Sequence, residues 1–311
     1  MLFDNNTISV LRGEALEAER SGRLTDKQLN LIRSKKWFKL FVPKRFNGLG
    51  LTLPEVLRIE ESLAWIDGSV AWVVTLCAGA GWFVGFAHQD FIKTLLDDDN
   101  FCFAGSGAVG TADKEPDGFR INGSWKYASG SLHATAFTVN CAINGTDEIR
   151  SFFLLPNEVI VKHTWNAMGM VATGSHSFEA KDQHIGTERQ FIITPDHATL
   201  NDDIYQYPFL QLAEATLAAN ISGMALRFAE LSGDKSNFLD RYRNTFFDAI
   251  DNNILSKVSI VSHDLVKASR EVVNDLYSRC GLSAANRDTE INRVWRNFHT
   301  AAQHSLFQKR P

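Results

Sequence analysis

The feature that most constrains the fold is a change in the spacing of apolar residues at Phe101. Before it, over residues 1–98, apolar side chains recur every three or four positions, as they do along one face of an α-helix. Over residues 119–129 they alternate with polar side chains, which is the pattern of a β-strand with one buried face. Helical spacing returns at residue 210. The sequence therefore predicts three parts in the order α, β, α.

These parts predict an α+β multidomain protein. We expect an all-α domain over residues 1–98, a β-barrel or β-sandwich domain over 99–200, and a helical bundle over 201–311. The 311 residues suffice for two or three packed units of roughly 100–150 residues each. Asn144-Gly145 predicts a hairpin turn, whereas Asn122-Gly123 is read either as a turn or as a kink within a strand. Further strands are expected over residues 137–142, 150–155, 159–163, 177–180 and 190–193.

Composition excludes several functional classes. A net charge of −4 produces no global basic field for nucleic acid or an anionic membrane. The four cysteines form no C-x-x-C pair, which favours free thiols in a reducing compartment. The nine histidines form no H-x-x-x-H or H-E-x-x-H motif, so no metal site is expected. Since no basic segment and apolar run open the chain, we expect a cytoplasmic protein.

One charge-free stretch, residues 68–87, is long enough to span a membrane. The alternative is a helix that is buried on all sides within the protein. Asp67 and Asp90 flank the stretch without any asymmetry of Lys and Arg. The stretch is also rich in Ala and Gly, which suit close helix packing, so we favour the buried helix.

Gly105, Gly107 and Gly110 match the dinucleotide-binding pattern G-x-G-x-x-G, but their context differs from it. That pattern must open a helix, whereas the residues from Thr111 onward predict a loop leading to a strand. We therefore treat the match as chance with respect to the dinucleotide fold. The small residues, including Ser106, still leave backbone N–H groups accessible to a planar or anionic ligand.

Ser129 ends the alternating strand, on the face predicted to carry Trp125 and Tyr127. It is either a hydroxyl aimed at a cofactor ring between aromatic walls or a turn serine, and from pattern alone the turn is the commoner case. Thr173 and Ser175 belong to a second small polar loop, which taken alone is an ordinary turn.

Two further candidates lie in the C-terminal helices. Glu214 is either a buried base or a first-turn Glu favoured by the helix dipole, and the second is commoner. His299 and His304 are five residues apart on the last predicted helix, residues 288–307. They do not share a helix face, which makes them a poor metal pair.

Five stretches together resemble the acyl-CoA dehydrogenase superfamily of flavoproteins. Residues 42–51, VPKRFNGLGL, resemble its P-x-x-x-G-G-x-G loop, with Asn47 in place of one Gly. Residues 60–71, EESLAWIDGSVA, resemble its E-x-L-A-x-x-D-x-S-x-A helix pair. Residues 118–134 with 165–176, and 293–304, RVWRNFHTAAQH, are similar to the flavin-dependent monooxygenases of this fold.

The resemblance implies that the β-domain holds one side of the isoalloxazine of FAD or FMN. Ser129 would match the serine that hydrogen-bonds flavin N5, and His304 the histidine near the reacting oxygen. A separate reductase would supply the reduced flavin, and the chain would form a homo-oligomer, a dimer or tetramer. The residues expected to bind the cofactor are Gly105, Ser106, Gly107, Thr111, Trp125, Tyr127, Ser129, Thr173 and Ser175.

Three functions remain open at this point. The first is a monooxygenase that uses reduced flavin and O2 on a small aromatic or apolar substrate. The second is an acyl-CoA dehydrogenase with Glu214 as its base. The third is a non-catalytic family member with a structural or regulatory role, because the C-terminal bundle is shorter than is usual in the family and a helix is expected to be shortened or missing.

Overall fold

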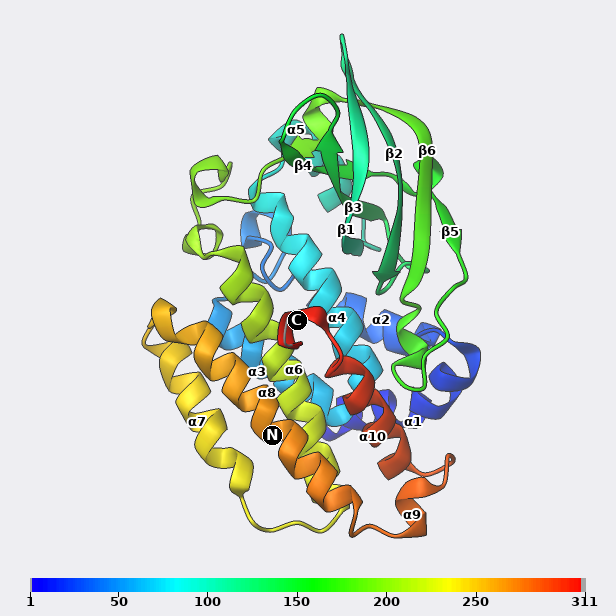
Figure 1. Cartoon of the computed structure of the whole chain (residues 1–311), viewed down its shortest axis with the longest axis vertical. Coiled ribbons are helices and arrows are strands. Elements are labelled where there is room, and N and C mark those ends of the chain that lie inside the picture. The colour runs from blue at the N-terminus through cyan, green and yellow to red at the C-terminus, as the bar shows by residue number, and fades with distance from the viewer. Residues whose placement is uncertain (1, 309–311) are drawn as a thin grey trace.

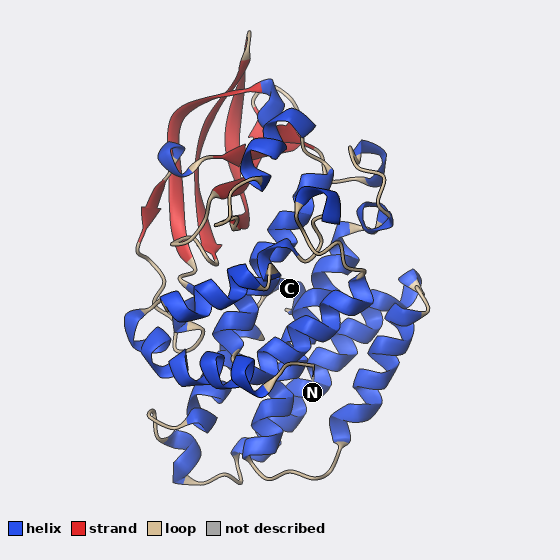
Figure 2. Ribbon diagram, turned by 180° about the vertical axis from the view of Figure 1, so that it is seen from behind, coloured by secondary structure: helices blue, strands red, loops and turns tan. Residues whose placement is uncertain are grey.

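The computed structural model describes residues 2–308, with helices at both ends of the chain and all strands between residues 103 and 191. Figure 1 and Figure 2 show the sheet at one end of the long axis and most of the helices packed together below it. The α, β, α order and the three-part architecture are thus confirmed. The two helical parts share one apolar core, and most of the buried side chains of the sheet form a second core.

Local sequence signals explain where the N-terminal helices begin. Thr25 and Gln28 form a capping box, in which each side chain binds the backbone of the other. At the start of the third helix, Glu55 accepts the backbone N–H and the hydroxyl of Thr52, both at 2.8 Å, and Pro54 lies in the first turn, where proline is tolerated. The N-terminal helices are α1 (Asn5–Ser21), α2 (Asp26–Ser34), α3 (Leu53–Ile66), α4 (Gly68–Gly81) and α5 (Gln89–Leu96).

Helix α4 and the short 3-10 helix after it form the apolar stretch that resembled a membrane span. Asp67 caps α4 by accepting the backbone N–H of Val70 at 2.8 Å. By length and composition the segment Gly68–Gly85 could cross a membrane, yet 83% of it is buried inside the protein. It packs against α3, α6 (Phe209–Leu231) and the first strand. The expectation of a buried core helix is therefore confirmed.

The β-domain is one seven-stranded mixed sheet, where a barrel or sandwich was expected. Only β1 and β3 pair in parallel, and all other neighbours are antiparallel. The predicted turn at Asn144-Gly145 joins β3 to β4, whereas Asn122-Gly123 is a kink inside β2. The strand order is β5 (Ile160–Lys162), β6 (His176–Gly186), β2 (Gly118–Ala128), β1 (Phe103–Glu115), β3 (Ala136–Ile143), β4 (Ile149–Leu154) and β7 (Gln190–Phe191).

Strand β1 is longer than expected and contains a bulge. Residues 111–115, expected as a loop, continue the strand and pair with β2. Between Gly105 and Val109 the register against β3 shifts, so that residues 106–108 face only Val139. This bulge frees backbone groups from the ladder at the middle of the sheet.

Up to residue 308 the C-terminal bundle contains four main helices. The long amphipathic region 238–278 is two helices, separated where Asn253 adopts a left-handed conformation with φ +50°. The helix expected over residues 288–307 spans Glu290–Ala301, so His304 lies beyond its end. The elements are α6, α7 (Phe238–Asp251), α8 (Leu255–Tyr277), the short α9 (Leu282–Ala285) and α10 (Glu290–Ala301).

Candidate active site

A large cavity lies where the sheet meets the helices. Its volume is about 1150 Å³, and its walls come from β1–β4, the loop before β6, α4, α6 and the segment from α10 to Leu306. This volume exceeds the roughly 300–1,000 Å³ typical of a small-molecule site. Lys126 is the only Lys, Arg, Asp or Glu among the described residues that line it. The cavity therefore has room for more than one neutral or weakly charged ligand group.

The β1 bulge forms one wall of the cavity. Ser106 holds it by donating its hydroxyl to the carbonyl of Lys126 at 2.6 Å and accepting the N–H of Ala108 at 3.3 Å. At Gly105 a Cβ atom would lie 2.3 Å from the Thr138 hydroxyl oxygen, so a larger residue would have to displace the Thr138 side chain. A Cβ on Gly107 would meet only open space. The bulge thus presents bare backbone to the cavity, as a flat ring with polar edges requires.

Ser129 lies in the same cavity wall, in hydrogen-bonding contact with the loop before β6. Its hydroxyl is 2.8 Å from that of Ser175, which is 2.6 Å from the hydroxyl of Thr173. Ser129 and Ser175 line the cavity, whereas Thr173 lies behind Ser175 and outside the lining. Of the two small polar loops found in the sequence, the second thus supports the first.

Helix α10 fixes that loop from the other side. The Asn297 side-chain oxygen accepts the N–H of Met170 at 2.6 Å, and the Arg296 guanidinium donates to the carbonyl of Met168 at 2.8 Å. At Gly169 a Cβ atom would lie only 2.1 Å from the Arg296 carbonyl oxygen. The two methionines line the cavity, so α10 determines the position of one wall.

His304 enters the cavity after α10 has ended. In Figure 1 the chain after α10 turns back toward the middle of the molecule, over α4 and α6. The imidazole packs edge-on against Trp72, with 6.0 Å between ring centroids. Burial lowers the pKa of His304, so the ring is neutral at pH 7. Its Nδ1 accepts the N–H of Leu306 at 3.4 Å, which assigns the ring hydrogen to Nε2.

Two more residues predicted to bind a cofactor, Trp125 and Thr111, lie outside the cavity lining, and a third, Tyr127, lies at its exposed edge. Trp125 is fully buried in the core of the sheet, where it stacks on Phe178. Thr111 is an exposed residue that pairs with Asn122 along β2. Tyr127 does border the cavity but is 71% exposed, with φ +65°. Its left-handed backbone and the register shift against β6 break the alternation, so Trp125 and Tyr127 do not share a face.

Glu214 also lies outside the cavity lining. Its carboxylate is 3.2 Å from the Nε2 atom of His263 on α8, so the side chain is directed toward the bundle. Its neighbours Ala213 and Thr216 line the cavity instead. Glu214 therefore lies on a different face of α6 from Ala213 and Thr216. The sequence of an apolar helix does not indicate which of its faces borders a cavity.

Sequence reasoning missed the opposite wall of the cavity. Thr75 and Thr216 add hydroxyl groups there, and His299 lines the cavity from α10 together with Trp295. A usable signal existed for Thr75, a polar residue inside an otherwise apolar helix. The apolar side chains of this wall are Trp72, Leu76, Phe83, Phe209, Leu212 and Leu217.

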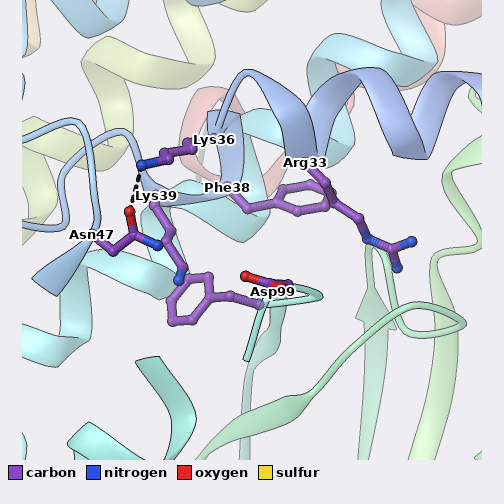
Figure 3. A pocket seen from close by; sticks show the side chains of 7 residues that line it. Arg33, Lys36, Phe38, Lys39, Asn47 and Asp99 are labelled. Carbon is purple, nitrogen blue, oxygen red and sulfur yellow. Dashed lines mark hydrogen bonds between the residues drawn. The ribbon is translucent and has the colours of Figure 1, made fainter. Parts of the chain in front are cut away.

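A second, much smaller pocket of about 60 Å³ lies by α2 and the loop after it. Figure 3 shows Lys36 bonded to Asn47, with the Arg33 guanidinium pointing away from both lysines. The ammonium of Lys39 donates to the carbonyl of Leu96 at 2.7 Å. Lys36 and Lys39 already have hydrogen-bond partners, and the Arg33 guanidinium points away from them, so the large cavity remains the candidate site. Among residues 2–308 no group of three or more His, Cys, Asp or Glu could hold a metal ion.

Comparisons with known proteins agree with this arrangement. Residues 201–309 match the family model of the acyl-CoA dehydrogenase C-terminal domain. The chain is 26% identical over 222 residues to indole-3-acetate monooxygenase of Pseudomonas putida, covering 70% of this chain and 57% of that protein. It is 24% identical over 302 residues to the oxygenase subunit HsaA of a flavin-dependent monooxygenase from Mycobacterium tuberculosis, covering 91% of this chain and 75% of that one.

Two solved structures share the fold over nearly the whole chain. The HsaA monooxygenase from M. tuberculosis superimposes with a TM-score of 0.86 at 21% identity, covering 96% of this chain and 89% of that one. XiaF from Streptomyces sp., in complex with FADH2 and glycerol, superimposes with a TM-score of 0.85 at 19% identity, covering 97% and 89%. The chain is thus similar to the acyl-CoA dehydrogenase C-terminal domain over residues 201–309, and over most of its length to the oxygenase components of flavin-dependent monooxygenases.

Proposed function

We propose that this chain is the oxygenase component of a flavin-dependent monooxygenase, acting on a small aromatic or apolar substrate. The observation that carries the proposal is the meeting of Ser129 and His304 in one cavity. They are far apart in the sequence, and each lies on a different wall. Bare backbone from the β1 bulge completes the first wall, and an apolar surface completes the second.

The first wall fits the isoalloxazine ring of a flavin. Such a ring needs a flat surface and hydrogen-bond partners along its edge, which the bulge at residues 106–108 and the Ser129 hydroxyl provide. When bound and reduced, the flavin supplies two electrons and the site at which O2 is activated. Met170 and Trp165, which line the same cavity, would limit contact of the ring with water.

The second wall fits the substrate. Its side chains are aromatic and aliphatic, and the Thr216 hydroxyl, which donates to the carbonyl of Ala213 at 3.1 Å, leaves a lone pair for a polar substituent. His304 is neutral, with its hydrogen on Nε2, so it is suited to orient the substrate or to exchange a proton with it. The names of the relatives, which include a resorcinol hydroxylase as well as the indole-3-acetate enzyme, support an aromatic substrate.

The dehydrogenase alternative requires a base directed at the substrate. Glu214 is directed at His263 instead and does not line the cavity, so the geometry favours the oxygenase. The oxygenase role also requires a partner, a flavin reductase that delivers reduced FAD or FMN. We further propose a homo-oligomer, because apolar side chains are exposed along the C-terminal helices, among them Phe238, Ile254, Leu255, Ile260 and Leu282.

The test combines binding with turnover. The purified chain is titrated anaerobically with FADH2 and FMNH2, and then assayed with NADH, a flavin reductase and either indole-3-acetate or resorcinol. The expected result is binding of reduced flavin at micromolar concentration and formation of a hydroxylated product. Failure to bind either reduced flavin would refute the proposal, as would anaerobic bleaching of bound FAD by an acyl-CoA.

A further inference from the structure

Three buried hydroxyl groups form a continuous row that begins at the cavity lining with Ser129 and Ser175 and ends behind it with Thr173. We call this set the hydroxyl row. The oxygen atoms of Ser129 and Ser175 are 2.8 Å apart, and those of Ser175 and Thr173 are 2.6 Å apart. The Thr173 oxygen is 2.8 Å from the carbonyl oxygen of Met170. All three side chains are at most 4% exposed. Each of these distances is that of a hydrogen bond, so each contains one hydrogen.

The end of the row determines the direction of every bond in it. A carbonyl oxygen has no hydrogen, so Thr173 must donate to Met170. Because a hydroxyl has only one hydrogen, Thr173 can then only accept from Ser175. By the same reasoning Ser175 can only accept from Ser129. The Met170 carbonyl is held in place by the indole N–H of Trp165, which donates to it at 2.9 Å.

The Ser129 hydroxyl therefore points its only hydrogen at Ser175. What remains available to a ligand in the cavity is an oxygen lone pair. Ser129, the residue expected to contact flavin N5, is thus a hydrogen-bond acceptor at that contact. Its role as acceptor is determined by the hydrogen bonds of Ser175 and Thr173, which do not require contact with the flavin.

This polarity matters because the two redox states of flavin differ at N5. The reduced ring carries a hydrogen on N5 and donates there, whereas the oxidised ring carries a lone pair. An acceptor opposite N5 stabilises the reduced ring and repels the oxidised one. Resting on the proposed function, we infer that Ser175 and Thr173 are positioning residues that make the site selective for reduced flavin. An oxygenase component has use for such selectivity, because it must take reduced flavin from a reductase and release the oxidised form.

Two substitutions remove the directionality while leaving Ser129 in place. In Ser175→Ala the Ser129 hydroxyl loses its acceptor and is free to donate into the cavity. In Thr173→Val, which keeps the shape of the side chain, Ser175 loses its acceptor and is free to donate to Ser129. Thr173→Ser retains the hydroxyl and is the conservative variant. Ser131→Ala is the matched control, because Ser131 is equally buried but donates to the carbonyl of Gly174, outside the row.

The measured quantity is the ratio of the dissociation constants for oxidised and reduced flavin, from anaerobic titrations with FAD and FADH2 and with FMN and FMNH2. Wild type is expected to bind the reduced form more tightly. Ser175→Ala and Thr173→Val are each expected to lower the ratio about tenfold. For a two-electron couple this lowers the midpoint potential of the bound flavin by about 30 mV, which a redox titration checks independently. Thr173→Ser and Ser131→Ala are expected to keep the wild-type ratio.

The outcomes separate this inference from the proposed function. If both variants keep the wild-type ratio while flavin still binds, the hydroxyl row does not set the selectivity and the inference fails alone. If Ser131→Ala lowers the ratio as much as Ser175→Ala does, loop packing is responsible and the inference also fails. If wild type binds neither redox form, the proposed function fails and the inference fails with it.

Discussion

Replacement of Gly169 by alanine should destabilise the protein strongly, because the loop before β6 and α10 touch backbone to backbone. The new Cβ would lie 2.1 Å from the carbonyl oxygen of Arg296 and 2.6 Å from the N atom of Asn297. Both atoms belong to backbone, so neither can rotate away. The loop must therefore move away from α10.

The size of the effect follows from what the movement breaks. The bond from Met170 to Asn297 contributes about 1 kcal/mol, and that from the Arg296 guanidinium to Met168 about 1.5–3 kcal/mol. Overpacking adds about 1–3 kcal/mol. Because these terms overlap, we expect a loss on the order of 4 kcal/mol, a large share of a typical unfolding free energy of about 5–15 kcal/mol.

Urea unfolding, followed by tryptophan fluorescence and by far-ultraviolet circular dichroism, measures this loss. The matched control is Gly13→Ala, since Gly13 lies within α1 and a Cβ there meets no atom within 4 Å. That substitution should stabilise by up to about 1 kcal/mol through helix propensity. If the unfolding free energy of Gly169→Ala were within about 1 kcal/mol of wild type, the loop and α10 would not approach each other as closely as the structure shows.

Three further predictions concern titratable groups. Burial raises the pKa of Glu60 well above its ordinary value, so the folded state holds a proton that the unfolded state loses above about pH 4.3. The free energy of unfolding should therefore fall with rising pH, by up to about 1.4 kcal/mol per pH unit. Urea titrations at pH 5, 6 and 7 measure this slope, which Glu60→Gln should abolish. Burial lowers the pKa of His304, so the acid limb of the pH profile of kcat/KM should lie below pH 6.5. This limb should vanish in His304→Asn. An acid limb above pH 7 would contradict a neutral imidazole. Glu214→Gln should keep hydroxylation within about twofold of wild type, and a loss of several hundredfold in product formation would restore Glu214 as a catalytic base.

Much of the fold was predictable because its signals are local. The alternation in residues 119–129, the capping pairs of α2 and α3, and the Asn-Gly turn between β3 and β4 each depend on neighbours a few residues away. The errors arose where a longer-range pairing decided the outcome. Residues 111–115 form a strand because β2 lies beside them, and nothing in their own polar sequence indicates it.

The residues of the candidate site were also predictable only where a local motif marked them. Motif resemblance predicted Ser129 and His304, and both line the cavity, but their contact with a ligand and their roles stay predictions. It could not distinguish Tyr127, which borders the cavity, from Trp125, which is buried under the sheet. The left-handed backbone of Tyr127 and the register shift against β6 separate two side chains that were expected to share a face.

By itself the sequence determined the order of helices and strands, the burial of α4 and the resemblance to flavin-dependent monooxygenases. These follow from side-chain periodicity and from short motifs, which act over one or two turns of the chain. Only the tertiary structure decided that Glu214 faces His263, that Thr173 supports Ser175 from behind, and that α10 holds the loop at Gly169. Each of these depends on segments that are distant in sequence and are brought together only when the apolar core forms.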